Sequence, residues 1–98
     1  MAEVLRGITG FQWDLGNSGK NEREHGVTDR ESEEIFFNKP LLVARSVKGI
    51  PEIRYAALGK TYGSRLLAVG FTTRANKIRV ISARPMSRKE RELYEKES

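Results

Sequence analysis

Apolar and polar positions change their spacing near residue 40, and the second half of the chain has the pattern of β-strands. In residues 52–58 alternate side chains share one face, and residues 65–72 are apolar on both faces, as in a central strand. Because their connections are short, the last three predicted strands form an antiparallel meander. We predict strands at residues 41–44, 52–58, 65–72 and 78–84, and turns at residues 49–51, 59–64 and 74–77.

The first part of the chain is polar and has the pattern of helices. Residues 10–13 form a short strand with two aromatic side chains, and Asp14 after them is a residue type that often caps helix N-termini. We predict a helix over residues 14–25 that ends at Gly26, because glycine readily adopts the left-handed conformation that closes a helix. Residues 1–8 show no period, and we expect them to be a flexible lead-in.

Two capping boxes mark the other helices. In Thr28-Asp29-Arg30-Glu31 and in Ser87-Arg88-Lys89-Glu90, the hydroxyl and the carboxylate can each accept a hydrogen bond from a backbone amide at the start of a helix. They predict helices over residues 29–37 and 88–97. The element order is then β-α-α-β-β-β-β-α. This order indicates a single α+β domain over residues 1–98, with an antiparallel sheet and the helices packed on one side of it.

Composition excludes several kinds of site. A chain without cysteine has no disulfide, no thiolate-bound metal and no cysteine nucleophile, and its one histidine, His25, argues against a protein-held zinc ion. We therefore expect neither a metal nor another cofactor. No apolar run reaches the length of a membrane span, and none near the start resembles a signal peptide. We expect a cytoplasmic protein without a membrane partner.

The net charge of +5 is divided unevenly along the chain. Residues 14–34 hold seven acids and three bases, a net charge of −4, whereas residues 35–98 hold fourteen bases and five acids, a net charge of +9. A basic, strand-rich half favours a polyanionic partner such as nucleic acid, or an acidic protein. A solubilising surface is the alternative that charge alone leaves open.

Several motifs together resemble those of a known family. They are Phe11-Gln12-Trp13-Asp14, Asn21, His25-Gly26-Val27, Arg54-Tyr55, Leu58-Gly59, the string from Ile78 to Arg84, Ser87-Arg88-Lys89-Glu90-Arg91 and Tyr94-Glu95. In this combination the chain resembles BrnT-type toxins, and the resemblance covers residues 11–95. The closing string, I-R-x-I-S-A-R followed by S-R-x-E-R-x-x-Y, is the most specific part.

The resemblance implies a RelE-like fold and a ribonuclease that arrests translation, the toxin half of a type II toxin–antitoxin pair. It also implies a BrnA-like antitoxin that neutralises the toxin and carries the DNA-binding domain, so that operator DNA is contacted only through the antitoxin. We expect a stable complex with two copies of each chain.

Two positions depart from the family pattern, because Asn17 and Glu24 stand where lysine is usual. These departures motivate an alternative, a weakly active or inactive member that serves mainly as antitoxin partner and transcriptional co-repressor. A plain nucleic-acid-binding protein is the third hypothesis.

RNA cleavage without a metal needs a base for the 2′-hydroxyl, a stabiliser for charge on the phosphoryl oxygens, and a proton or cation for the leaving oxygen. Arginine suits the second task because its planar fork can hold two phosphate oxygens. The candidate catalytic residues are His25, Arg54, Arg79 and Arg84, of which we favour Arg54 and Arg84 as phosphate binders. Strict alternation puts Arg79 and Arg84 on opposite faces of their strand, unless a bulge or the strand end reorients one of them.

Other side chains are candidates for RNA binding, mostly through the phosphate backbone. These are Lys20, Arg23, Arg74, Lys77, Arg88, Lys89 and Tyr94. Structural alternatives stay open for several candidates. His25 can instead close the first helix, Tyr94 can dock the last helix, and Glu90 can act only in the capping box. For each arginine, a solvated or salt-bridged surface position is the alternative.

Overall fold

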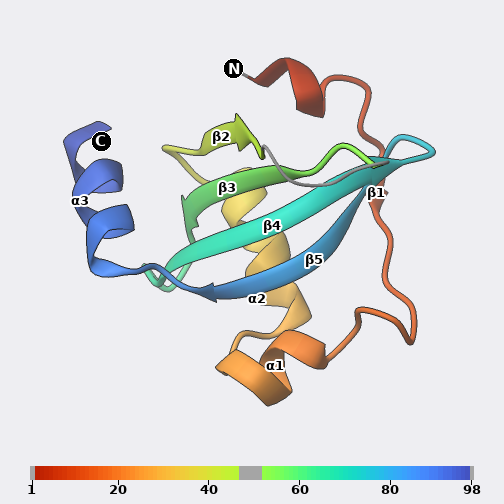
Figure 1. Ribbon diagram of the computed structural model, residues 1–98, viewed down its shortest axis with the longest axis horizontal. Helices are drawn as coiled ribbons and strands as arrows, with labels where there is room; N and C mark the ends of the chain where they lie inside the picture. Colours follow the sequence, from red (N-terminus) through yellow and green to blue (C-terminus); the bar gives the residue numbers. More distant parts are fainter. Residues whose placement is uncertain (1, 47–51, 98) are drawn as a thin grey trace.

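A five-stranded sheet with the strand order β1-β5-β4-β3-β2 organises the molecule (Figure 1). The computed structural model describes residues 2–46 and 52–97. Its strands are β1 (Gly10–Phe11), β2 (Leu42–Arg45), β3 (Tyr55–Lys60), β4 (Leu66–Arg74) and β5 (Lys77–Pro85). Its helices are α1 (Lys20–His25), α2 (Asp29–Glu34) and α3 (Arg88–Glu97), with 3-10 turns η1 (Ala2–Leu5) and η2 (Ile35–Phe37).

The strand pairing follows the prediction for the second half of the chain. β3, β4 and β5 form an antiparallel meander, and β2 pairs antiparallel with β3. β1 completes the sheet by pairing in parallel with β5, where Gly10 lies opposite Lys77. The α+β class and the predicted order of elements are confirmed. The turn predicted at residues 49–51 lies outside the described residues.

The helix predicted over residues 14–25 is wrong in its first half, because α-helix begins only at Lys20. Side chains there compete for the backbone amides that a helix would use. The Asp14 carboxylate accepts a hydrogen bond from the Gly16 amide, and the Asn17 carbonyl accepts one from the Asp14 amide, both at 2.8 Å. The segment before α1 is therefore a series of turns that its own side chains hold together.

Both predicted capping boxes are formed. The Thr28 hydroxyl accepts a hydrogen bond from the Glu31 amide at 3.1 Å, and the Thr28 amide donates to the Glu31 carboxylate at 3.0 Å. Ser87 and Glu90 exchange the same two bonds at the start of α3. The helix predicted over residues 29–37 is α-helical at first and ends as the 3-10 turn η2.

The main core lies on one face of the sheet, which α2 and η2 cover, while α1 lies along the free edge of β5. Its fully buried side chains include Val27, Ile35, Leu67, Val69, Phe71 and Val80. η2 approaches β3 closely at Gly59, where a Cβ atom would lie 2.7 Å from the Ile35 Cβ, so only glycine fits. The N-terminal segment also contacts this core, through Leu5 and Ile8.

α3 packs against the other face, near the end of β5. Its buried residue Tyr94 lies with Met86 against Leu42, Leu58 and Leu66, which alternate with the residues of the main core along their strands. The predicted one-sided arrangement thus holds for α2, whereas α1 lies at the edge of β5 and α3 lies against the opposite face. The rest of this second face carries the site described next.

Candidate functional site

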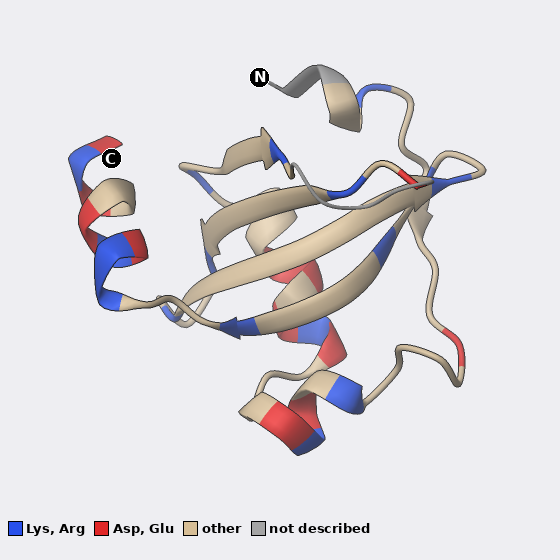
Figure 2. Cartoon of the chain, in the orientation of Figure 1, with Lys and Arg blue, Asp and Glu red and all other residues tan. Residues whose placement is uncertain are grey.

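A pocket rich in cations lies on the sheet face opposite the main core, and we call it the cation pocket. Its volume is about 190 Å³. Four of its lining residues are basic and one is acidic. Figure 2 shows the contrast with the helices, where most acidic residues gather. The lining residues are Gly16, Asn17, Lys20, Glu52, Arg54, Thr72, Arg74, Arg79, Val80 and Ile81.

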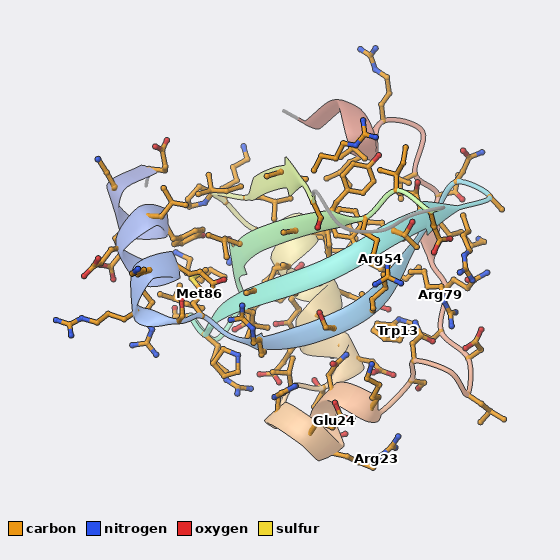
Figure 3. All side chains as sticks on the ribbon, viewed as in Figure 1. Trp13, Arg23, Glu24, Arg54, Arg79 and Met86 are labelled. Carbon is orange, nitrogen blue, oxygen red and sulfur yellow. The ribbon has the colours of Figure 1, made fainter. Side chains whose placement is uncertain are left out.

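Strand pairing brings two arginines together on either side of β4. On one side of β4, Thr72 pairs with Arg79 of β5. On the other side, the Thr72 hydroxyl donates a hydrogen bond to the Ile53 carbonyl at 2.7 Å. Arg54 follows Ile53 directly and faces the same pocket. Figure 3 shows Arg54 and Arg79 near each other at one end of the sheet. The strand pairing thus fixes where the backbone of each arginine lies, on either side of Thr72.

A β-bulge decides which arginines share this face. Gly70 of β4 pairs with Ser82 of β5, and the next residue, Phe71, pairs with Val80. Ile81 lies between these two partners and pairs with no residue of β4. Beyond the bulge the alternation of β5 is reversed, and Arg79 and Arg84 both lie on the face opposite the main core. The separation expected from strict alternation therefore does not occur, because β5 contains the bulge that was the stated exception.

Arg84 nevertheless lies outside the cation pocket. Its partner Ala68 is four residues from Thr72, the partner of Arg79, which separates the two arginines by about 13 Å along the strands. The Arg84 guanidinium donates two hydrogen bonds to the Glu90 carboxylate, at 2.7 and 2.9 Å. These bonds lower the pKa of Glu90 to about 2. Arg84 thus joins the end of β5 to the capping box of α3.

The arginines of the pocket differ in how far they are neutralised. Arg79 donates two hydrogen bonds to Asp14, at 2.8 and 3.1 Å, and Arg74 donates two to Glu52, at 2.7 and 3.2 Å. These hydrogen bonds lower the pKa of both carboxyl groups. Among the described residues, the Arg54 guanidinium has neither a hydrogen bond nor an ion pair, so Arg54 is the arginine most available to an anion.

Two side chains tie the segment around α1 to β5. The buried Asn17 amide donates to the carbonyls of Gln12 and Val80, each at 3.0 Å. The Lys20 ammonium donates to the Ile81 carbonyl at 3.2 Å. Asn17 therefore helps to build the pocket rather than to present a cation. Sequence analysis missed this role, because a polar residue in a polar segment gives no sign that it is buried.

The comparison with protein families gives this geometry a context. Residues 13–90 match a family described as the ribonuclease toxin, BrnT, of type II toxin–antitoxin systems. The chain belongs to the BrnT family. The matched range includes every residue that lines the cation pocket. No curated protein matches the sequence.

In this BrnT-family chain, His25 lies apart from the cation pocket. It is the last residue of α1, its side chain is 41% exposed, and its Nε2 lies 3.9 Å from a carboxylate oxygen of Glu24. Gly26 follows in the left-handed conformation, with φ 69°, and caps the helix. Figure 3 shows Arg23 and Glu24 on α1, away from Arg54. His25 thus lies in the last turn of α1, next to the Gly26 cap.

The other predicted RNA-binding residues are spread over the BrnT-family chain. Lys77 is exposed at the start of β5, and Arg88 and Lys89 are exposed in the first turn of α3. Tyr94 is buried, its hydroxyl donates to the Pro40 carbonyl at 2.6 Å, and burial raises its pKa. A nucleobase can therefore stack on Tyr94 only if α3 moves. The residues that the pocket does bring together are Lys20, Arg54, Arg74 and Arg79.

Glu52 is a residue of the pocket that sequence analysis missed. Its position at the start of the predicted strand gave no indication of function, although its isolation from other acidic residues was a signal. Between Glu34 and Glu90, Glu52 is the only acidic residue of the sequence. A single acidic residue within a long basic stretch indicates a contact with a basic side chain, which here is that of Arg74.

Among residues 2–46 and 52–97, no group of three or more histidine or acidic side chains is placed to hold a metal ion. Within the same ranges, every helix is too short or too polar to cross a bilayer.

Proposed function

We propose that this BrnT-family chain is an endoribonuclease that cleaves RNA at the cation pocket without a metal ion, and that this cleavage inhibits translation. The observation that carries the proposal is that, within the described part of the chain, the Arg54 guanidinium has no hydrogen bond or ion pair and lies beside Arg79 in the pocket, in a family of ribonuclease toxins. Two guanidinium groups can hold the oxygens of one phosphate while negative charge grows on them, which stabilises the transition state.

The basic side chains of the pocket have different roles in this proposal. Arg54 makes the first contact with the phosphate, because within the described chain its guanidinium has no ion pair, and the nearby Glu52 carboxylate is hydrogen-bonded to Arg74 instead. Arg79, whose side chain is only 15% exposed, is the fixed second donor. Lys20 and Arg74 add positive charge that attracts the RNA backbone and makes binding salt-dependent.

A row of small residues crosses the same sheet face beside the pocket. Strand pairing aligns Ala44, Ala56, Gly70 and Ser82 across four strands. Because their side chains are small, RNA bound at the pocket has room to extend across this face of the sheet. In that direction it would meet the positive side chains at the far end, namely Arg84, Arg88 and Lys89.

We also propose that a BrnA-like antitoxin neutralises the chain by covering this face, in a complex with two copies of each protein. A type II toxin implies an antitoxin partner. A basic face favours an acidic segment of that partner, because complementary charge speeds and orients association. Operator DNA would then be contacted only through the antitoxin, in the cytoplasm where translated RNA is found. Co-expression with the neighbouring gene product and size-exclusion chromatography test the complex.

The activity is tested with purified protein and total cellular RNA in EDTA, in the presence and absence of ribosomes. We expect the wild type to cleave, and Arg54→Ala to reduce the rate by about 10²–10³ because one preorganised donor is lost. Arg30→Ala is the matched control, since Arg30 is an exposed arginine of α2 outside the pocket. Circular dichroism verifies that each variant is folded. A wild type without cleavage in either condition contradicts the proposal.

A weakly active or inactive member that acts as antitoxin partner and transcriptional co-repressor is the second candidate. Two observations favour it. Arg74 and Arg79 are each paired with an acid, and neither Asn17 nor Glu24 adds a cation to the pocket. A wild type that forms the complex and cleaves no RNA would support this function.

A further inference from the structure

Among the described residues that line the cation pocket, only Glu52 has a carboxylate. We propose that Glu52 is the base that removes the proton from the attacking 2′-hydroxyl of the RNA. This inference rests on the endoribonuclease activity proposed above and names a further catalytic residue for it.

The lining side chains leave no other base in the pocket. A general base needs an unprotonated atom at neutral pH within reach of the reacting hydroxyl. Arginine and lysine are protonated at that pH, and the amide of Asn17 and the hydroxyl of Thr72 are not basic. His25, the chain's only histidine, does not line the pocket. Among the described residues that line the pocket, Glu52 alone meets the chemical requirement, since the Asp14 carboxylate binds Arg79 at the edge of the pocket and does not line it.

The position of Glu52 suits this role. Arg74, at the end of β4, holds both oxygens of the carboxylate, which fixes its orientation. A carboxylate can accept about four hydrogen bonds, so lone pairs remain for a substrate hydroxyl after Arg74 has used two. The Glu52 side chain is 33% exposed, which leaves one side of it open to the pocket. Arg54, the proposed phosphate binder, is two residues further along the chain.

Three guanidinium groups face Glu52, those of Arg74, Arg54 and Arg79, and they lower its pKa, mainly through the hydrogen bond from Arg74. The carboxylate is therefore ionised at neutral pH and ready to accept a proton. When a phosphate draws these arginines toward its own oxygens, Glu52 loses part of their stabilisation and becomes more basic. Substrate binding thus increases the basicity of the Glu52 carboxylate.

Glu52 takes the proton of the 2′-hydroxyl, the 2′ oxygen attacks phosphorus, and the bond from phosphorus to the 5′ oxygen breaks. The departing 5′ oxygen takes a proton from water, and Glu52 then returns its proton to the hydroxide that remains. The products are a 2′,3′-cyclic phosphate and a 5′-hydroxyl, and the protein is unchanged.

The test compares Glu52→Gln with Glu22→Gln, an exposed glutamate of α1 outside the pocket, so that both variants change the charge equally. The probe is a single-stranded RNA oligonucleotide of mixed sequence, in EDTA, used alone and bound as message on purified ribosomes. We expect Glu52→Gln to lower the cleavage rate by about 10²–10⁴ and Glu22→Gln to leave it unchanged. RNA affinity should not fall in either variant.

Further readouts separate a base from a positioning residue. The amide in Glu52→Gln still accepts a hydrogen bond from Arg74, so a residue that only positions Arg74 would largely be replaced by it. For a base, the wild-type rate falls at acid pH as the carboxylate is protonated, this fall disappears in Glu52→Gln, and Glu52→Asp restores part of the rate. Wild-type products should end in a cyclic phosphate.

The outcomes distinguish this inference from the function on which it rests. A wild type that cleaves, with Glu52→Gln within about threefold of it, overturns the role of Glu52 and leaves the endoribonuclease proposal intact. A wild type that does not cleave overturns both. If Glu52→Gln is unfolded by circular dichroism, Glu52→Ala decides, and a folded Glu52→Ala with an unchanged rate and pH profile overturns the inference.

Discussion

Asp14 holds Arg79 by two hydrogen bonds, of 2.8 and 3.1 Å, at the edge of the cation pocket. The Asp14 side chain is 54% exposed, whereas that of Arg79 is 15% exposed. The carboxylate therefore lies on the solvent side of the cation. An RNA phosphate that approaches Arg79 has to compete with Asp14.

Asp14→Asn should strengthen RNA binding, by less than about tenfold, because it removes a negative charge beside Arg79 and keeps an acceptor for the Gly16 amide. The dependence of affinity on salt should also steepen, as each additional phosphate contact releases counterions. Fluorescence anisotropy with a single-stranded RNA at several salt concentrations measures both. Glu22→Gln controls for net charge, and an equal gain in that variant would argue against competition by Asp14.

The pair formed by Arg84 and Glu90 should contribute to stability rather than to cleavage. The pKa of Glu90 falls from an ordinary 4.5 to about 2, so folding favours the ionised form. The contribution of the ionised Glu90 to the free energy of unfolding is complete above about pH 5 and is lost as the pH falls through 2. We expect Arg84→Ala and Glu90→Gln each to cost about 1–2 kcal/mol at neutral pH, after allowance for solvent around the half-exposed Arg84.

Thermal unfolding at neutral pH and at about pH 3 measures this effect, because the difference between wild type and Glu90→Gln should shrink in acid. The cleavage rates of the folded variants should stay close to that of the wild type. A loss of cleavage in folded Arg84→Ala, as large as that in Arg54→Ala, would instead return Arg84 to the active site.

Local signals predicted much of the fold. The capping boxes at Thr28 and Ser87 were predicted correctly because their partners lie within four residues of each other in the sequence. The strands of the meander were predicted because their apolar side chains repeat with the period of the sheet. The helix predicted to begin at Asp14 failed because two local side chains capture backbone amides, which a count of polar residues does not detect.

The site itself depends on relationships between distant residues. The bulge at Ile81 exists only through the pairing of β4 with β5, and it alone puts Arg79 on the face of Arg84. Likewise, the contact between Glu52 and Arg74 spans 22 residues. The sequence could therefore provide the arginines as candidates, while only the sheet register could show which of them meet.

Asn17→Lys tests whether the lysine usual in the family can be restored at this position. The Asn17 side chain is buried and donates to two carbonyl groups, so a lysine there must either bury its charge or break the turn. We expect it to destabilise the protein by at least about 2 kcal/mol. Glu24→Lys, at an exposed position on α1, should change stability by less than about 0.5 kcal/mol. Urea unfolding compares them, and a stable, more active Asn17→Lys would contradict the structural role of Asn17.

Gly59→Ala should weaken the core without altering the cation pocket, because the two lie on opposite faces of the sheet. The new Cβ would lie 2.7 Å from the Cβ of Ile35, a stiff and fully buried side chain, so η2 has to move away from β3. Overpacking of this kind costs about 1–3 kcal/mol. Gly63→Ala is the matched control, since its Cβ would meet nothing closer than 3.9 Å. Thermal unfolding should show a lower Tm only for Gly59→Ala, and RNA cleavage well below that Tm should equal that of the wild type. A folded Gly59→Ala that has lost cleavage would show that the packing of η2 and the arrangement of the arginines are coupled through the sheet.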